Sequence, residues 1–223
     1  MSGTAVILQH GETGPPGLLA RWCAARGIPY VVHHAGRGPL PELNGQPFVA
    51  SLGSKHNPDD THLAEVAAER AYLADALARD VPVLGLCFGG QMLSSVLGGA
   101  IDAAPEPELG WHDVRTEDDT IVRGGPWLQW HFHRFSVPDG ARALASSPVG
   151  PQAFAHGRHL GVQFHPESTI EIVSAWARAD RERLAALGID DGEARLERGR
   201  RHAEAAVAAA FHLFDAFWQR TRT

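Results

Sequence analysis

Short apolar runs alternate with helical patterns along the first hundred residues. Each run is four or five residues long at most and rich in strand-forming side chains, which predicts buried strands. The helical segments between them place apolar residues at three- and four-residue steps. Strands separated by helices of this length form βαβ units, so this half predicts a parallel sheet with helices on both faces. The four strands are predicted at 5–8, 30–32, 48–52 and 82–86.

The helix predicted between the third and fourth strands illustrates how polar positions are assigned to solvent. Its start is predicted at 58–61, where Pro, Asp, Asp and Thr follow one another. Apolar residues then recur at helical spacing from Leu63 to Leu77. This pattern leaves Glu65, Glu69 and Arg70 for solvent.

The second half of the chain has a different texture. From 101 to 164, short apolar runs are separated by Gly, Pro and Asp, which indicates antiparallel strands added to the parallel core. One hairpin is predicted from 153–156 and 159–164, with its turn at Gly157-Arg158. Helical patterns return at 170–187 and near the chain end, with a polar break at 188–193.

Length and composition limit the classes of protein that fit. The 223 residues are predicted to form a single domain, 1–223, with a C-terminal helical extension at about 188–223. Lys plus Arg number 20 against 26 for Asp plus Glu, a formal charge of −6, which argues against a nucleic-acid partner. No apolar run reaches the roughly 18–20 residues of a membrane span, so no membrane partner is expected. Two cysteines make no disulfide framework, which favours a cytoplasmic location.

The segment 82–91, Pro-Val-Leu-Gly-Leu-Cys-Phe-Gly-Gly-Gln, carries the strongest chemical signal. A buried strand ends in Gly85-x-Cys87-x-Gly89 and runs directly into a helix. This is the cysteine counterpart of a nucleophile elbow, where glycines relieve the crowding of a tight turn. The helix N-terminus activates a thiol and stabilises an oxyanion. The alternative is that Cys87 is a small buried apolar residue, as most free cysteines are.

A second segment, 161–167, offers the base that a thiol nucleophile needs. His165 follows an apolar run, Pro166 stops the strand, and Glu167 can turn back to one imidazole nitrogen. A His-Pro-Glu sequence by itself is more typical of a surface turn. Together with the elbow, it predicts a Cys87-His165-Glu167 triad.

These two motifs, Gly85-Leu-Cys-Phe-Gly-Gly-Gln91 and Gly161-Val-Gln-Phe-His-Pro-Glu167, resemble those of the class I (triad-type) glutamine amidotransferases. A weaker resemblance extends over most of residues 5–168. There the chain is similar to the amidotransferase domain of GMP synthetase and to free-standing bacterial relatives. The resemblance implies an α/β fold with an open, mostly parallel, doubly wound, flavodoxin-like sheet. Added antiparallel strands and C-terminal helices complete the expected architecture.

The resemblance also implies a role for each motif residue. Cys87 attacks the side-chain amide of glutamine, His165 moves the proton, and Glu167 orients His165. Glutamate and ammonia are released through a thioester. The oxyanion hole is expected from the backbone N–H of Phe88 and of the loop 52–55, where Gly53 is favoured over Ser54 as the donor.

Further substrate-binding residues follow from the same likeness. Gln91 matches a glutamine that helps to hold the substrate. The stretch 131–133 corresponds to a family His-Gly-Asp, so His131 matches while Phe132 replaces glycine and His133 replaces aspartate. A histidine cannot pair with the substrate ammonium as an aspartate does. His131 and His133 share one strand face, as two metal ligands do, but no zinc spacing is present and neither a metal nor a cofactor is expected.

Three functions are compatible with this sequence. The first is a glutaminase that supplies ammonia to a separate synthetase subunit, because 223 residues leave no room for a synthetase domain. The second is a γ-glutamyl hydrolase or peptidase that acts on a γ-glutamyl conjugate and needs no partner. The third is a non-catalytic regulatory subunit that retains the fold.

Overall fold

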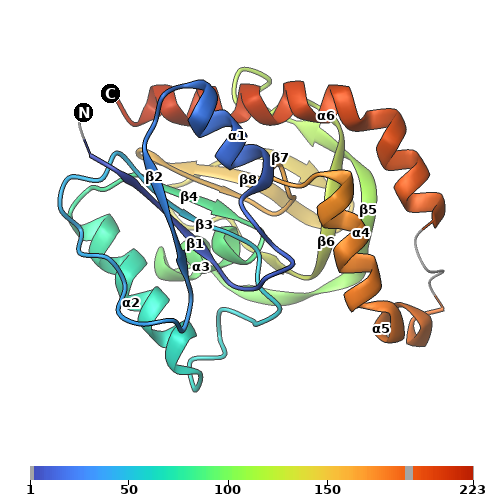
Figure 1. Cartoon of the computed structure of the whole chain (residues 1–223), viewed down its shortest axis with the longest axis horizontal. Coiled ribbons are helices and arrows are strands. Elements are labelled where there is room, and N and C mark those ends of the chain that lie inside the picture. The colour runs from blue at the N-terminus through green and yellow to red at the C-terminus, as the bar shows by residue number, and fades with distance from the viewer. Residues whose placement is uncertain (1–2, 189–192, 223) are drawn as a thin grey trace.

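The computed structural model describes residues 3–188 and 193–222, and within them nine strands form one sheet (Figure 1). The strands are β1 (Ala5–Gln9), β2 (Tyr30–His34), β3 (Val49–Ser51), β4 (Val83–Leu86), β5 (Ile101–Thr116), β6 (Gly125–Phe135), β7 (Arg142–Ser147), β8 (Gly150–His156) and β9 (His159–Val162). Their order across the sheet is β2-β1-β3-β4-β9-β8-β7-β5-β6. β2, β1, β3, β4 and β9 pair in parallel, as predicted for the first half.

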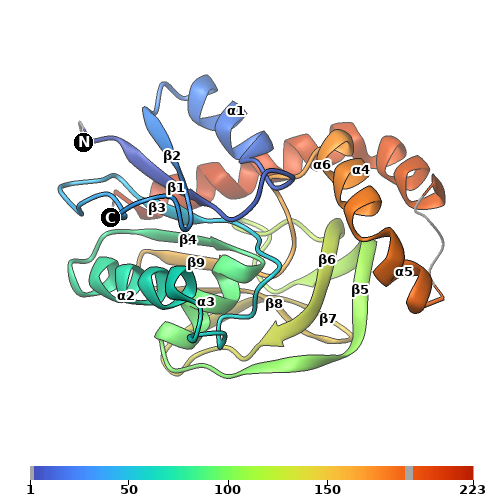
Figure 2. The same cartoon turned by 60° about the horizontal axis from the view of Figure 1, so that its bottom comes forward.

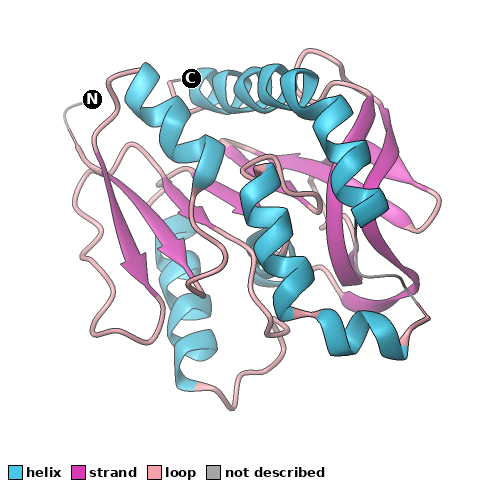
Figure 3. Cartoon of the chain, turned by 45° about the vertical axis from the view of Figure 1, so that its right-hand side comes forward, coloured by secondary structure: helices cyan, strands magenta, loops and turns pink. Residues whose placement is uncertain are grey.

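Helices cover both faces of the parallel strands (Figure 3). The helices are α1 (Gly17–Ala25), α2 (Ala64–Ala78), α3 (Phe88–Val96), α4 (Ile170–Ala179), α5 (Arg181–Ala186) and α6 (Glu193–Arg220). Alternate residues of β1 belong to different layers. Ile7 packs in the same core cluster as residues of α1 and α6, whereas Leu8 packs with residues of α2 and α3. The open, doubly wound α/β architecture is therefore confirmed.

The antiparallel part of the sheet lies at the edge away from β2 (Figure 2). The predicted hairpin is present, with β8 paired to β9 around Gly157. β5 and β6 form a longer ribbon than the sequence predicts, with a register shift between Ala103 and Glu108. That shift spans Pro105 and Pro107, which lack the N–H that a ladder bond needs.

Two predicted helices have different bounds in the structure. The second helix begins at Ala64 rather than at 58–61, because Asn57 and Asp60 close a turn through side-chain to backbone hydrogen bonds. The helical pattern at 170–187 divides into α4 and α5 at Asp180. Of the polar break predicted at 188–193, residues 189–192 lie outside the described residues.

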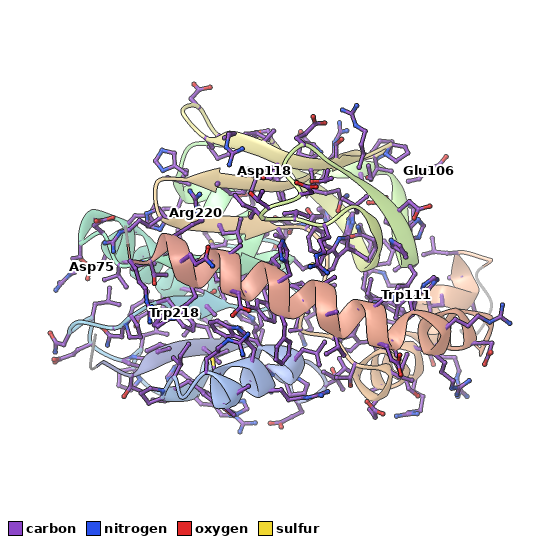
Figure 4. The ribbon with its side chains drawn as sticks, turned by 90° about the horizontal axis from the view of Figure 1, so that it is seen from above. Asp75, Glu106, Trp111, Asp118, Trp218 and Arg220 are labelled. Carbon is purple, nitrogen blue, oxygen red and sulfur yellow. The ribbon has the colours of Figure 1, made fainter. Side chains whose placement is uncertain are left out.

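The last helix lies across the face that α1 also covers (Figure 4). Trp218 packs against Trp22 of α1, and Arg26, which directly follows α1, forms an ion pair with Asp215 of α6. Further along α6, Gly199 lies against Trp111, where an added Cβ would be 2.3 Å from the indole. Over the described residues, no helix combines the length and hydropathy that crossing a membrane requires.

Candidate active site

The turn from β4 into α3 presents Cys87 at the carboxyl edge of the parallel strands. Cys87 has φ +52° and ψ −106°, a conformation that residues with a Cβ rarely adopt. Its backbone N–H donates to the carbonyl of Val162 in the neighbouring strand β9 at 2.9 Å. Its side chain is nearly buried, with 6% of the residue exposed. A strained residue at the start of a helix is the geometry predicted for a nucleophile elbow.

The glycines around Cys87 are required by the close approach of neighbouring backbone. A Cβ on Gly89 would lie 2.1 Å from the carbonyl oxygen of Ser51, and one on Gly90 would lie 2.3 Å from that of Val162. A Cβ on Gly85 would lie 2.4 Å from the carbonyl oxygen of Gly89. Helix α3 therefore packs directly onto β3 and β9, and this contact fixes the position of Cys87.

His165 and Glu167 follow β9, the strand beside β4. The imidazole Nδ1 lies 2.8 Å from Oε1 of Glu167, and both side chains are buried. Because an ionised carboxylate only accepts, Nδ1 carries a proton in this hydrogen bond. Nε2 is buried and makes no hydrogen bond to a nitrogen or oxygen atom of the described residues. The ring of Trp176 packs against the imidazole at a centroid distance of 4.6 Å.

The loop after β3 brings Gly53 against both Cys87 and His165. A Cβ on Gly53 would lie 2.8 Å from Cε1 of His165 and 3.9 Å from Cβ of Cys87. Burial alone would lower the pKa of His165. The charges of Cys87 and Glu167 and their hydrogen bonds outweigh this effect and raise the pKa to about 10. The sulfur and the imidazole are therefore close enough to interact strongly, as a Cys-His pair must.

A cleft of about 320 Å³ opens beside this pair, which is within the size range of small-molecule sites. Cys87, His165, Glu167 and Gly53 all contribute to its wall. Lys55 and Asp180 add one basic and one acidic group. The remaining lining residues are His10, Gly11, Thr13, Gly14, Ser54, Trp130, Trp176 and Ala179.

The substrate-binding residues expected from the sequence lie elsewhere. Among the described residues, Gln91, His131, Phe132 and His133 do not line this cleft. Gln91 is buried and donates to the carbonyl of His133 at 3.1 Å. The guanidinium of Arg183 lies over the ring of Phe132, with Cζ of Arg183 3.5 Å from the ring centroid.

The ring of His131 is held inside the protein on both sides. One nitrogen lies 3.0 Å from the carbonyl of His133, and the other lies 3.1 Å from both Gln129 and Glu108. Gln91 connects this network to the active site, since its amide also reaches Gln163, whose own amide lies 3.8 Å from the Cys87 sulfur. These residues therefore form a buried polar layer behind the nucleophile.

The sequence reasoning missed His10 and misplaced Glu69. Periodicity predicts Glu69 in solvent, but it is 2% exposed and its carboxylate lies 2.5 Å from Nε2 of His10. A helical glutamate looks solvent-facing when its partner comes from a distant strand, here 59 residues away. One signal was available for His10, because it directly follows the buried strand β1 at the same sheet edge as Cys87.

The protonation state of His165 gives a direct test of this geometry. Since its pKa is raised, the imidazolium persists above neutral pH and is lost as pH rises through about 10. We expect the Cε1–H NMR signal of His165 to titrate with a midpoint well above 6.5. In Cys87→Ala the thiolate charge is absent, so the midpoint moves to lower pH. An unchanged midpoint in this variant would contradict the proximity of the two groups.

Comparison with known proteins places these features in a family context. Residues 56–173 match the family model described as glutamine amidotransferase class-I. One component of the glutamine-hydrolyzing GMP synthase from Sulfolobus acidocaldarius is 42% identical over 97 residues, which are 40% of this chain and 52% of that protein. The glutamine-hydrolyzing GMP synthase from Aeropyrum pernix is 38% identical over 94 residues, 39% of this chain and 18% of that protein. The match thus spans about half the length of the Sulfolobus protein and about a fifth of the length of the Aeropyrum protein.

Solved structures resemble the chain over nearly its whole length. A glutamine amidotransferase from Thermotoga maritima superposes with a TM-score of 0.90 at 22% identity, covering 98% of this chain and 99% of that one. A glutamine amidotransferase from Methylobacillus flagellatus gives 0.88 at 24% identity, covering 99% and 95%. These two similarities concern the fold, including its C-terminal helices.

Proposed function

The chain belongs to the class-I glutamine amidotransferase family, and from this premise we propose that it hydrolyses the side-chain amide of glutamine to glutamate and ammonia. The observation that carries the proposal is the strained Cys87 beside a buried His165–Glu167 pair in one cleft. The proposed catalytic residues are Cys87, His165 and Glu167.

The proposed reaction has two halves that share the same histidine. The Cys87 thiolate attacks the carbonyl carbon of the amide, and backbone N–H groups of Phe88 and the Gly53 loop stabilise the oxyanion. His165 gives its proton to the amide nitrogen, the C–N bond breaks and ammonia leaves. Water then attacks the thioester and gives its proton to His165, and glutamate is released as the C–S bond breaks.

The amino-acid end of the substrate needs two complementary charges. We propose that Asp180 contacts the α-ammonium and Lys55 the α-carboxylate, because both line the cleft that holds Cys87. His133 stands where the resemblance expects an aspartate. We propose that Gln91, His131 and the backbone carbonyl of His133 support the pocket from the polar layer behind Cys87 rather than from the cleft, and that Phe132 contributes through its contact with Arg183.

A separate synthetase subunit is the proposed acceptor of ammonia. The Sulfolobus relative is named as one subunit of a GMP synthase, which supports a protein that works with a partner. A second candidate function, γ-glutamyl hydrolysis, is favoured by the histidine at position 133. It uses the same triad on a γ-glutamyl conjugate and needs no ammonia acceptor.

Glutamate release by the purified full chain distinguishes these functions. We expect slow hydrolysis of glutamine that accelerates when the synthetase subunit of the same organism is added. Faster stand-alone hydrolysis of γ-glutamyl anilides or peptides than of glutamine would favour the hydrolase. Inactivity on every γ-glutamyl compound, with and without partners, would contradict both and favour a regulatory subunit.

A further inference from the structure

A second buried histidine–glutamate pair lies beside the proposed catalytic one. His10 follows β1, and its Nε2 lies 2.5 Å from Oε2 of Glu69, which belongs to α2. The hydroxyl of Ser51 donates to the other carboxylate oxygen at 2.6 Å. Glu69 and Ser51 are 2% and 0% exposed. Burying a carboxylate is unfavourable unless partners compensate it, so this arrangement secures the orientation of His10.

The other side of the His10 ring contacts the loop that contains Gly53. Nδ1 of His10 lies 3.1 Å from the carbonyl oxygen of Gly53. A carbonyl only accepts, so Nδ1 carries a proton and donates it. The ring also packs edge-on against Phe88, with a centroid distance of 4.8 Å. His10 therefore contacts both segments from which the oxyanion hole is proposed to come.

This hydrogen bond fixes the peptide unit between Gly53 and Ser54. The described residues contain no cis peptide bond, so the Ser54 N–H points opposite to the anchored Gly53 carbonyl. Among the described residues, neither the Gly53 nor the Ser54 N–H donates to another residue. The peptide is thus held by its oxygen while its nitrogen is available to a ligand.

We propose that His10, held by Glu69 and Ser51, is a positioning residue that orients the Gly53–Ser54 peptide so that the Ser54 N–H stabilises the oxyanion. The inference rests on the proposed function, and it assigns the second donor to Ser54, whereas the sequence favoured Gly53. Burial alone would lower the pKa of His10. The charge and hydrogen bond of Glu69 and the hydrogen bond to the Gly53 carbonyl outweigh this effect and raise the pKa. Both neighbours of the ring, the Glu69 carboxylate and the Gly53 carbonyl, are hydrogen-bond acceptors, so the protonated ring donates to both.

Two isosteric substitutions separate the two contacts of His10. In His10→Asn the amide nitrogen takes the place of Nδ1, so the donor to Gly53 is retained. In His10→Gln the amide nitrogen takes the place of Nε2, so the contact with Glu69 is retained and the donor to Gly53 is lost. We expect His10→Gln to lower kcat for glutamine by about 10²–10³-fold, the usual effect of losing one oxyanion donor, with little change in KM. His10→Asn should lower kcat much less. His34→Gln, the same substitution at a histidine outside the cleft, is the matched control.

Alkylation of Cys87 by iodoacetamide separates positioning from effects on the thiol. This displacement forms no oxyanion, so we expect its rate to be unchanged in both His10 variants. A parallel loss of alkylation would show that His10 acts on Cys87 and would overturn the proposal. Equal kcat losses in His10→Asn and His10→Gln, or no loss in His10→Gln, would also overturn it. If His10→Gln does not fold, Glu69→Gln serves instead and should lower kcat without slowing alkylation.

The amide NMR signal of Ser54 tests the inference independently of turnover. We expect it to shift or broaden in His10→Gln and to stay near its wild-type position in His10→Asn. Wild-type protein that hydrolyses no γ-glutamyl compound would contradict the proposed function, and this signal would then still report whether His10 orients the peptide. A Ser54 signal that is identical in all three proteins would overturn the inference even if the wild type is active.

Discussion

Replacing Cys87 by alanine is expected to abolish glutamate release from glutamine, with a loss of at least about 10⁴-fold in kcat by analogy with other triad enzymes. In the proposed mechanism, no thioester forms without the sulfur, and His165 has no nucleophile to activate. The substitution keeps a Cβ at φ +52°, so the strained turn is retained and the fold should be unaffected. Coupled detection of glutamate, with thermal unfolding measured in parallel, checks this result.

Cys23 provides the internal control for this prediction. It is fully buried on α1, and burial raises the pKa of its thiol to about 12, so it stays protonated and unreactive near neutral pH. A glutamine-mimicking alkylator is therefore expected to add one label to the wild type, located on Cys87 by peptide mass spectrometry. Cys87→Ala should take up none, whereas Cys23→Ala should be labelled like the wild type. Label on Cys23, or turnover that persists in Cys87→Ala, would contradict the assigned nucleophile.

Local geometry is predicted best where the candidate residues lie in short, continuous motifs. Cys87 was predicted because strand, turn and helix follow one another within ten residues, and the close contacts of Gly85, Gly89 and Gly90 explain that spacing. His165 and Glu167 were predicted because only one residue separates them. Parallel pairing of β4 with β9 then brings the two motifs together, and the sequence pattern did not predict this long-range contact.

The features that the sequence did not reveal depend on contacts between distant segments. Glu69 fits the solvent face of α2 by periodicity, and it is buried because His10, just after β1, and Ser51 of β3 both contact its carboxylate. Asp180 lies within a continuous helical pattern, yet the helix is interrupted there, between α4 and α5. Its carboxylate accepts a hydrogen bond from the Trp130 indole at 2.8 Å. Local periodicity does not report such partners, because each comes from another part of the sheet.

The two histidine–glutamate pairs differ in what their second nitrogen contacts. Nε2 of His165 is left without a nitrogen or oxygen partner in the described residues and lies near the Cys87 sulfur. His10 uses both nitrogens in fixed hydrogen bonds. The first arrangement suits a group that must give up and take back a proton. The second suits a group that holds a loop in place.

Loss of His165 is expected to reduce turnover more than loss of the Glu167 charge. His165→Ala removes the group proposed to move the proton in both half-reactions, so we expect a loss of kcat comparable to that of Cys87→Ala. Glu167→Gln keeps an oxygen that can accept from Nδ1, and the Glu167 carbonyl still accepts from the Leu18 N–H at 2.8 Å. The reduction of kcat in Glu167→Gln should therefore be about 10- to 100-fold smaller than in His165→Ala, as for the orienting carboxylate of other triads.

Glu171→Gln is the matched control for this comparison, because Glu171 is exposed on α4 and lies outside the cleft. Single-turnover and steady-state kinetics on all three variants measure the ranking. Because the Glu167 charge raises the pKa of His165, Glu167→Gln should also move the NMR titration of His165 to lower pH. Equal losses in His165→Ala and Glu167→Gln would mean that the carboxylate does more than orient the imidazole, and an unmoved titration would mean that its charge does not act on His165. The roles assigned to the two residues would then have to be redrawn.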